Sequence, residues 1–582
     1  MILIKIINNF DYFFLNKRIN YFSDINKNKG EFMKFKKLLI VVTVIVMALS
    51  CVLLASCQSK IRSRYEKVTT KYKNGVTDFE HGWSNYNNGY DKEGNIVDKL
   101  IQSVPNEKQL LHTDNEYYNF VHFGMNTMTD KEWGDGTETV DMFNPQVVDT
   151  DQWCKVFKDS GSKGVIFTAK HHDGFALWDT KTTDFNVMNS GYKKDIMRMV
   201  AESCKKYGLK FGIYLSPWDI HEPSYGKAGG INDINSYNYI FYNQVNEVLD
   251  IVRDIDVELF EFWFDGARAS DAEVDEGFEY AWEDIYTLIN TKFPNCVIGN
   301  CGNDVRWVGN EAGYVRDSEW SVILTSLPED KQQSSEEDAK RLGLHYESND
   351  RGSRDIINAA NKISADWQVK YYPAESDVRI RTKWFWHKKD KVKTANQLAD
   401  LYFTNVGMNS HFLLNVAPND KGVIEEKDIK ALMGMKEIVD KTIQQQVMPV
   451  SVCTSGYNNG KIQVVDNSSA PMSVLNDGVY GSDNYNGYKL PDNGYIMDFF
   501  FNDIKSFGRI DIREDLQYSQ RVEAFEVWAV VNGKWKLVAD NTIIGNRKIF
   551  VFKKAIKTNQ LRFVFKQSRS NPYIRSVQFY EF

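Results

Sequence analysis

Between about residues 105 and 435, short apolar runs alternate with stretches that have a helical period. Parallel strands covered on both faces are apolar at nearly every position, and six runs have this character: Phe120–Phe123, Gly164–Ala169, Lys210–Leu215, Glu258–Phe264, Val297–Gly299 and Phe412–Val416. Two helical stretches between them are Asp195–Tyr207, which is followed by a terminating Gly208, and Asn235–Arg253. This alternation predicts an α/β fold, a (β/α)-barrel over residues 104–440, with functional groups at the carboxyl ends of the strands.

After about residue 445 the helical period disappears. Short alternating runs take its place, separated by turns rich in Gly, Asn and Asp, and they predict an antiparallel β-sandwich over residues 446–582. The expected strands are Ile496–Phe501, Ser506–Ile512, Ala524–Val531, Trp535–Val538, Ile549–Phe552 and Gln560–Phe565.

The N-terminal segment bears on the compartment. After Met33, three lysines precede an apolar run that ends Leu54-Ala55-Ser56-Cys57. This pattern resembles a bacterial lipoprotein signal over residues 33–56, with lipidation at Cys57. We interpret residues 1–32 as an extension upstream of the true start, and the polar residues 57–103 as a tether. The alternative is a single membrane-spanning anchor. Both interpretations predict an exported protein, and we expect a lipoprotein, periplasmic or at the cell surface.

The net charge and the cysteine content argue against several other classes of protein. The formal net charge is −7, and because the leader is basic, the remainder is more acidic still. Nucleic-acid binding needs basic surface, so no nucleic-acid partner is expected. Of the 7 cysteines, those after Cys57 are odd in number and have no Cys-x-x-Cys spacing. They are expected to be small buried hydrophobes rather than metal ligands or a disulfide framework.

One carboxylate follows an apolar run directly, because Asp265 ends the segment Phe-Trp263-Phe-Asp265-Gly. Its alternative role is to cap a loop. At a barrel strand end, however, an ionised Asp265 could attack an anomeric carbon. Cleavage of a glycosidic bond with retention requires a second carboxyl group roughly 5–5.5 Å away, which acts as acid and then as base.

Two glutamates are candidates for this second carboxyl group. Glu311, in Trp307-Val-Gly-Asn-Glu311-Ala-Gly, has apolar neighbours that would raise a carboxyl pKa. Glu375, in Tyr-Pro-Ala-Glu375-Ser-Asp, is the rival. A plain surface loop remains the alternative for Glu311.

Histidines also collect at the expected strand ends. His122 closes the first strand, and His171 and His172 close the second. Adjacent strand residues point to opposite faces, so hydrogen bonds to sugar hydroxyls are favoured over a shared metal ion. His122 could equally be a satisfied core residue.

Several aromatic residues suit a sugar ligand. Glu132 and Trp133 form a matched pair, a carboxylate for vicinal hydroxyls and a ring for stacking. Trp263 and Trp384 are candidates for the apolar patch that a deoxy sugar needs, although each is as readily explained by core packing.

Taken in order, these segments resemble the α-L-fucosidases, family 29 of the glycoside hydrolases. The resemblance covers about residues 104–435 and is carried by His122-Phe-Gly-Met-Asn-Thr, Lys131-Glu-Trp-Gly, Phe143-Asn-Pro, Asp151-Gln-Trp, Thr168-Ala-Lys-His-His-Asp-Gly-Phe, Leu215-Ser-Pro-Trp-Asp, Trp263-Phe-Asp-Gly-Ala and Leu413-Leu-Asn-Val-Ala-Pro. The resemblance implies catalysis by a nucleophilic side chain, without a cofactor or a metal ion in the reaction.

The resemblance also implies residue roles. Asp265 would be the nucleophile, and the fucose contacts would be His122, Glu132, Trp133, His171 and His172, with Trp263 lining the site. The segment around Glu311 looks like the subgroup that acts on α-1,3/1,4-linked fucose of branched glycans, where this glutamate is the acid/base. Fucosylated oligosaccharides or glycoconjugates are then the expected partners. A broad-specificity fucosidase and a non-catalytic sugar-binding lipoprotein are the alternatives.

The C-terminal region is similar to discoidin-like (F5/8 type C) modules. The similarity runs through Ile510-Asp-Ile-Arg-Glu, Gln520-Arg-Val-Glu-Ala-Phe and Pro572-Tyr-Ile-Arg-Ser-Val. Such modules often bind sugars and sometimes hold structural calcium. A purely structural role against the barrel is the alternative.

Overall fold

The computed structural model describes residues 100–582 except 268, 271–272, 317–318, 327–367, 459–460, 476–479 and 481–486. The expected lipoprotein signal, Cys57 and almost all of the tether therefore lie outside the described residues. Across the part that is described, no helix has the length and apolar character needed to cross a membrane.

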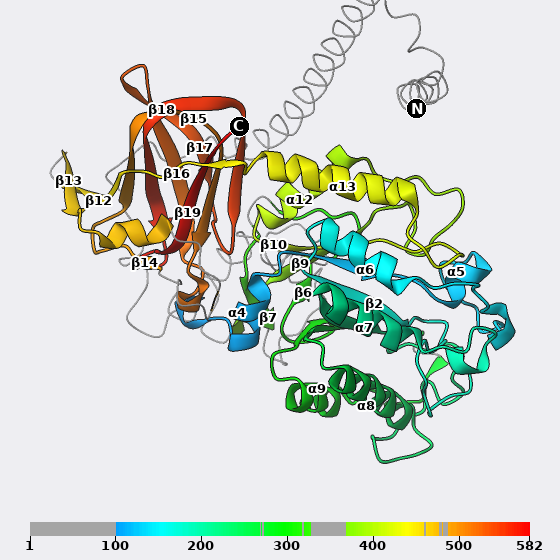
Figure 1. Cartoon of the computed structure of the whole chain (residues 1–582). Coiled ribbons are helices and arrows are strands. Elements are labelled where there is room, and N and C mark those ends of the chain that lie inside the picture. Colours follow the sequence, from blue (N-terminus) through cyan, green and yellow to red (C-terminus); the bar gives the residue numbers. More distant parts are fainter. Residues whose placement is uncertain are drawn as a thin grey trace, which may run out of the picture. The chain divides into compact units, whose positions relative to one another are not determined.

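Residues 117–415 contain a parallel sheet that closes almost completely into a barrel, as predicted (Figure 1). Its eight strands follow the order β5-β4-β3-β2-β1-β10-β9-β6. They are β1 (Tyr117–Val121), β2 (Gly164–Lys170), β3 (Lys210–Leu215), β4 (Leu259–Phe264), β5 (Val297–Asn300), β6 (Arg306–Trp307), β9 (Ala374–Arg379) and β10 (Ser410–Asn415). Most are buried along their whole length, which explains their nearly unbroken apolar sequences.

Helices cover the outside of this sheet. They are α4 (Glu107–Thr113), α5 (Met125–Thr129), α6 (Thr150–Asp159), α7 (Ile196–Tyr207), α8 (Tyr237–Ile255), α9 (Trp282–Lys292), α12 (Ala395–Val406) and α13 (Glu426–Lys441). Each tends to bury one stripe against the strands. In α7, for example, Val200 and Cys204 are buried, and Gly208 ends the helix in the left-handed conformation with a φ of 63°.

Two barrel strands were not predicted, β6 and β9. Strand β9 carries Glu375, Asp377 and Arg379, and the first two of these side chains are buried. Because its interior-facing positions are polar, β9 is not an apolar run, and the sequence pattern did not predict it. A short antiparallel pair, β7 (Val322–Ser326) with β8 (Gln368–Tyr371), stands outside the barrel sheet.

The C-terminal region is antiparallel, as expected, and forms a nine-stranded sheet around its own apolar core. Its strands are β11 (Gln445–Gln446), β12 (Ser451–Asn458), β13 (Lys461–Asp466), β14 (Tyr488–Lys489), β15 (Ile496–Glu514), β16 (Val522–Val531), β17 (Lys534–Asn541), β18 (Lys548–Ser568) and β19 (Tyr573–Glu581).

At two places the sequence predicted two strands where the structure has one. Ile496–Phe501 and Ser506–Ile512 belong to one strand, β15, and Ile549–Phe552 and Gln560–Phe565 belong to β18. These strands have 19 and 21 residues and pair with each other across register shifts after Phe500 and Phe507. The polar residues at these shifts look like turns in the sequence, but they mark irregularities within continuous strands.

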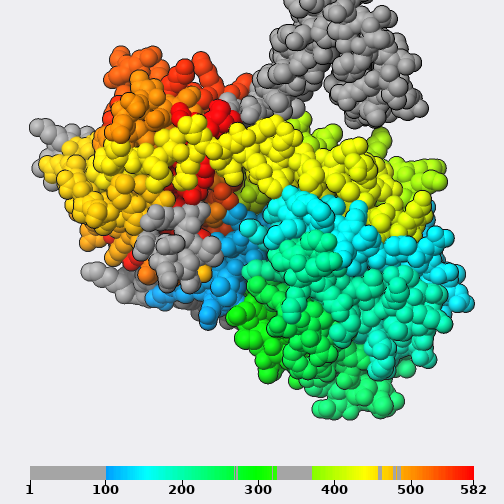
Figure 2. Space-filling model, viewed as in Figure 1, coloured from blue at the N-terminus to red at the C-terminus, as the bar shows by residue number. Residues whose placement is uncertain are grey.

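The helix α13 packs beside α12 on the barrel and buries only Asp428, Ala431, Leu432 and Met435 (Figure 1). Its outer face forms part of the molecular surface, coloured yellow in Figure 2. The five described cysteines are free thiols, as expected, and three of them, Cys154, Cys204 and Cys296, are fully buried.

Candidate active site

The site is built at the carboxyl ends of the barrel strands. Along β4 and its end, Glu261, Trp263 and Asp265 are two residues apart, so their side chains point to the same side, into the barrel. Trp263 is 5% exposed, and only the last of the three opens toward solvent, with 26% of the Asp265 side chain exposed.

Both oxygens of Asp265 are held in place. The Tyr214 hydroxyl donates to Oδ2 over 2.8 Å, and the backbone N–H of Ala267 donates to Oδ1, also over 2.8 Å. The Nε2 atom of His172 lies 3.8 Å from Oδ2. A carboxylate fixed in this way at the mouth of a barrel is oriented for attack on a bound substrate.

The three predicted histidines meet beside this carboxylate. The rings of His171 and His172 are 4.1 Å apart between centroids, and the His122 ring is 5.7 Å from His171. Burial lowers the pKa of His122 to about 4, lowers that of His171 well below its usual value, and also lowers that of His172. All three are therefore neutral near pH 7, and each offers one donor and one acceptor.

Neighbouring side chains fix the ring orientations of these histidines. His122 Nδ1 lies 2.8 Å from Asn415 Oδ1, and His172 Nδ1 lies 2.7 Å from the Ser216 hydroxyl. Since an amide oxygen only accepts, His122 Nδ1 carries the hydrogen, which leaves its Nε2 as an acceptor. Within the described residues, no group of three close metal-binding side chains includes His171 or His172.

Trp133 and Glu132 lie at the rim. The Trp133 ring is 54% exposed and makes edge contacts with His172 and Trp218, with ring centroids 5.1 and 5.4 Å away. The Glu132 carboxylate accepts hydrogen bonds from the backbone N–H groups of Trp384 (2.7 Å) and Phe385 (3.0 Å). Glu132 therefore also anchors the loop that carries Trp384.

Glu311 and Glu375 are in contrasting environments. Glu311 lies on a turn in which Asn310 Oδ1 accepts from the backbone N–H groups of Ala312 and Tyr314, and its side chain is 49% exposed. Its Oε2 is 3.4 Å from Nη1 of Arg379, whose guanidinium lies 5.1 Å from the centre of the Trp384 ring. Glu375 is completely buried in the barrel interior.

Sequence reasoning did not identify Tyr214, Asn415, Ser216 or Arg379 as part of this region. Each lies on or just after a barrel strand, where the period of two fixes the side to which its side chain points. Alternation along Gly212, Tyr214 and Ser216 was a usable signal, but the surrounding apolar run obscured it.

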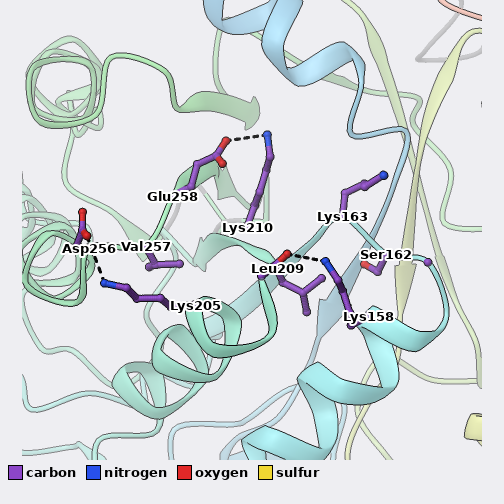
Figure 3. A pocket seen from close by; sticks show the side chains of 11 residues that line it. Lys158, Ser162, Lys163, Lys205, Leu209, Lys210, Asp256, Val257 and Glu258 are labelled. Atoms are coloured by element: carbon purple, nitrogen blue, oxygen red, sulfur yellow. Dashed lines mark hydrogen bonds and ion pairs between the residues drawn. The ribbon is translucent and has the colours of Figure 1, made fainter. Parts of the chain in front are cut away.

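A cavity of about 480 Å³ lies at the other end of the barrel, near the amino ends of β2, β3 and β4 (Figure 3). Two of the four lysines that line it contact the ends of helices, and a third, Lys210, pairs with Glu258. Lys158 donates to the Gly208 carbonyl just after α7, over 2.9 Å, and Lys205 donates to the Ile255 carbonyl at the end of α8, over 2.7 Å. These contacts stabilise helix C-termini and do not form an anion site.

Comparisons with known proteins agree with this geometry. The family model described as Alpha-L-fucosidase matches residues 103–442. The chain belongs to the α-L-fucosidases of glycoside hydrolase family 29. It is 34% identical to Alpha-L-fucosidase 1 of Arabidopsis thaliana over 488 residues, which cover 82% of this chain and 88% of the relative.

Solved family 29 structures have the same architecture. A family member from an unknown rumen bacterium is 30% identical with a TM-score of 0.64, covering 82% of this chain and 77% of the other. A Ruminococcus gnavus family 29 fucosidase in complex with fucose is 25% identical with a TM-score of 0.67, covering 82% and 95%. This family 29 chain is therefore a glycoside hydrolase, an α-L-fucosidase, and catalysis in the family needs no cofactor.

Proposed function

We propose that the enzyme removes terminal α-L-fucose with retention of configuration, with Asp265 as nucleophile. The observation that carries this proposal is the fixed, partly exposed carboxylate at the end of β4, which receives hydrogen bonds from Tyr214 and Ala267. Retention requires a covalent fucosyl-enzyme intermediate on this carboxylate, followed by attack of water.

Glu311 is the proposed acid/base. It comes from a different loop than Asp265, and its contact with Arg379 brings it near Trp384 at the mouth of the barrel. The rival Glu375 is fully buried, and the Tyr118 hydroxyl and the Trp263 indole N–H donate to its carboxylate oxygens. A group enclosed in this way is poorly suited to exchange protons with a leaving group and with water.

The remaining residues form the proposed sugar site. His122, His171 and His172 would bond fucose hydroxyls together with Glu132, while Trp133, Trp263 and Trp384 supply apolar surface. The half-exposed ring of Trp133 is available to stack on a sugar. We further propose α-1,3/1,4-linked fucose of branched glycans as the substrate, on the resemblance of the segment around Glu311.

We also propose that the protein is exported and lipidated at Cys57, and that its C-terminal domain is a discoidin-like module with structural calcium. The first two depend on residues outside the described part. The third is supported by the antiparallel domain after residue 445.

Asp265→Asn should abolish turnover of an aryl α-L-fucoside, because the amide cannot form the glycosyl ester. Circular dichroism should show an unchanged fold. Asp159→Asn, an exposed carboxyl at the end of α6, is the matched control and should keep wild-type rates. Full activity in Asp265→Asn would remove the nucleophile assignment.

Glu311→Ala should reduce turnover by about 10²–10⁴-fold on substrates with poor leaving groups. Azide should partly restore turnover and yield an α-fucosyl azide, since it needs no general base. If Glu375→Ala behaves in this way instead, the two roles must be exchanged.

The linkage proposal has its own assay. Lewis-type trisaccharides should be hydrolysed efficiently beside α-1,2-linked and aryl fucosides. Equal rates on all of them would indicate a broad-specificity enzyme.

A further inference from the structure

Directly beneath the site, the barrel holds a second group of ionisable side chains, which we call the floor cluster. Its members come from five different elements and are all at most 5% exposed: His112 on α4, Tyr118 on β1, Glu261 on β4, Glu375 on β9 and His411 on β10. Throughout the described ranges, no ion pair joins either glutamate to a lysine or an arginine. The cluster therefore buries two carboxyl groups without a cation.

The two carboxyl groups have different surroundings. Glu375 Oε2 accepts a hydrogen bond from the Tyr118 hydroxyl, and Oε1 accepts from the Trp263 indole N–H over 2.8 Å. Both oxygens of Glu261 are also buried, and they face the Glu375 carboxyl, the Tyr118 hydroxyl and, at 3.6 Å, His112 Nε2. Two donors stabilise an ionised carboxylate on Glu375, whereas the Tyr118 hydroxyl near Glu261 already donates its single hydrogen to Glu375.

The histidines do not supply the missing positive charge. Burial, with a contribution from neighbouring His411, lowers the pKa of His112 well below its usual value, and burial lowers the pKa of His411 to about 4. Burial also raises the pKa of both glutamates, and the nearby Glu375 carboxyl raises that of Glu261 further. Two carboxylates this close and this buried cannot both be ionised near neutral pH.

We propose that Glu261 and Glu375 hold one proton between them, on Glu261, and that the ionised Glu375 is a positioning residue for the nucleophile. This inference rests on the proposed role of Asp265. The Glu375 carboxylate fixes the Trp263 indole, Trp263 fixes the Tyr214 ring, and the Tyr214 hydroxyl donates to Asp265.

Each contact in this path is direct. The Trp263 N–H reaches Glu375 over 2.8 Å, and the Trp263 and Tyr214 rings stack with centroids 5.3 Å apart and planes 15° apart. The Tyr214 hydroxyl then reaches Asp265 Oδ2 over 2.8 Å. Phe120 packs edge-on against Trp263 at 5.1 Å and keeps the indole from tilting away. A shift of the indole would therefore displace the donor to the attacking oxygen.

A divalent cation is the alternative occupant, because one ligand atom from each of His112, Glu261 and Glu375 lies within 4.8 Å of the others. The hydrogen bonding of His112 disfavours it. The Asn115 side-chain amide nitrogen lies 3.2 Å from His112 Nδ1 and can only donate to it, so the ring hydrogen is on Nε2. That nitrogen faces Tyr118 and Glu261, at 3.2 and 3.6 Å, with a hydrogen rather than a lone pair.

Two matched variants test the assignment. Glu261→Gln mimics the protonated acid, because its amide can donate where the carboxyl proton did, and kcat and KM should stay close to wild type. Glu375→Gln replaces the negative acceptor of the Trp263 N–H, and kcat should fall by about 10²-fold with little change in KM. Equal losses in the two variants, or a wild-type kcat in Glu375→Gln, would overturn the proposal.

Leaving-group dependence separates positioning from acid/base catalysis. The loss in Glu375→Gln should be the same for good and poor leaving groups, and azide should not restore it. A loss confined to poor leaving groups and rescued by azide would make Glu375 the acid/base and contradict the positioning role. Activity in Asp265→Asn would instead contradict the proposed function, so the two failures are distinguishable.

Infrared spectroscopy on the wild-type enzyme keeps the test independent of how Glu375→Gln folds. A buried protonated carboxyl should give a C=O stretching band at neutral pH that disappears in Glu261→Gln. Absence of that band, or stoichiometric divalent metal in the purified enzyme that is lost in Glu261→Gln, would overturn the shared proton.

Discussion

Two buried pairs of carboxyl groups in this molecule have different surroundings and, on our proposal, hold different numbers of protons. The floor cluster holds Glu261 and Glu375 without a cation. At the boundary between the barrel and the C-terminal sheet, Glu116 and Asp511 lie among Arg509, Arg513 and Arg547, an arrangement we call the arginine cluster. Its four ion pairs have N–O distances of 2.6 to 2.7 Å.

The arginines reverse the effect of burial. Burial alone would raise the pKa of Glu116, but Arg513 and Arg547 lower it to about 2. In the same way Arg509 and Arg547 outweigh burial and lower the pKa of Asp511 to about 2. Burial alone thus does not decide whether a carboxyl group is charged; nearby cations and hydrogen-bond donors do.

The largest expected effect tests the arginine cluster. Glu116→Gln should lower the free energy of unfolding by about 3–5 kcal/mol, because it removes one carboxylate from two buried guanidinium groups. Chemical denaturation would measure this loss. The exposed pair Lys155–Asp159 offers the control, since Asp159→Asn should change stability by less than about 1 kcal/mol. Equal losses in the two variants would show that burial of the arginines does not matter.

The second prediction concerns acid pH. The pKa values of Glu116 and Asp511 are lower in the folded than in the unfolded chain, so these groups stabilise the fold above about pH 4–4.5, near the usual carboxyl values. That contribution should be lost as the pH falls toward about 2. Unfolding free energies of wild type and Glu116→Gln, measured across this window, should converge at its acidic end. A constant difference between them would contradict the assignment.

The smallest effect concerns the floor cluster and has the opposite sign. The pKa of Glu261 is raised in the fold, so its contribution to stability is present below about pH 4.5, the ordinary value, and is lost as the pH rises toward the folded value. Glu261→Gln removes this titration and should therefore unfold at a higher temperature than wild type in alkaline buffer. The difference should shrink in acid. A larger benefit at acid pH would refute the protonated state.

The sequence predicted the apolar strands of the barrel but not the strand whose interior side chains are polar. Apolar runs identified the strands that end in His122, His171 and Asp265, because close packing on both faces forces apolar residues there. Strand β9 was missed because its interior side chains, Glu375 and Asp377, are polar, and only the closed barrel supplies their partners. The pairing of Glu375 with Trp263, which is 112 residues away, exists only in three dimensions.

The C-terminal domain shows a second kind of limit. The turn-like residues between Phe501 and Ser506 predicted the end of a strand, yet β15 continues through them. Pairing with β18 on both sides of the irregularity holds the strand together, and this long-range pairing has no local signal.

The turn that carries Glu311 is structurally separate from the strand that carries Asp265. It is bounded by Gly309 and Gly313, whose φ values of 87° and 76° are left-handed, and it lies outside the strands of the barrel, whereas Asp265 directly follows one of them. Insertions or exchanges within this excursion would leave the frame around the nucleophile untouched. On the proposed assignment, changes in this turn act on the leaving-group side of the reaction, while Asp265 keeps its hydrogen-bond donors Tyr214 and Ala267.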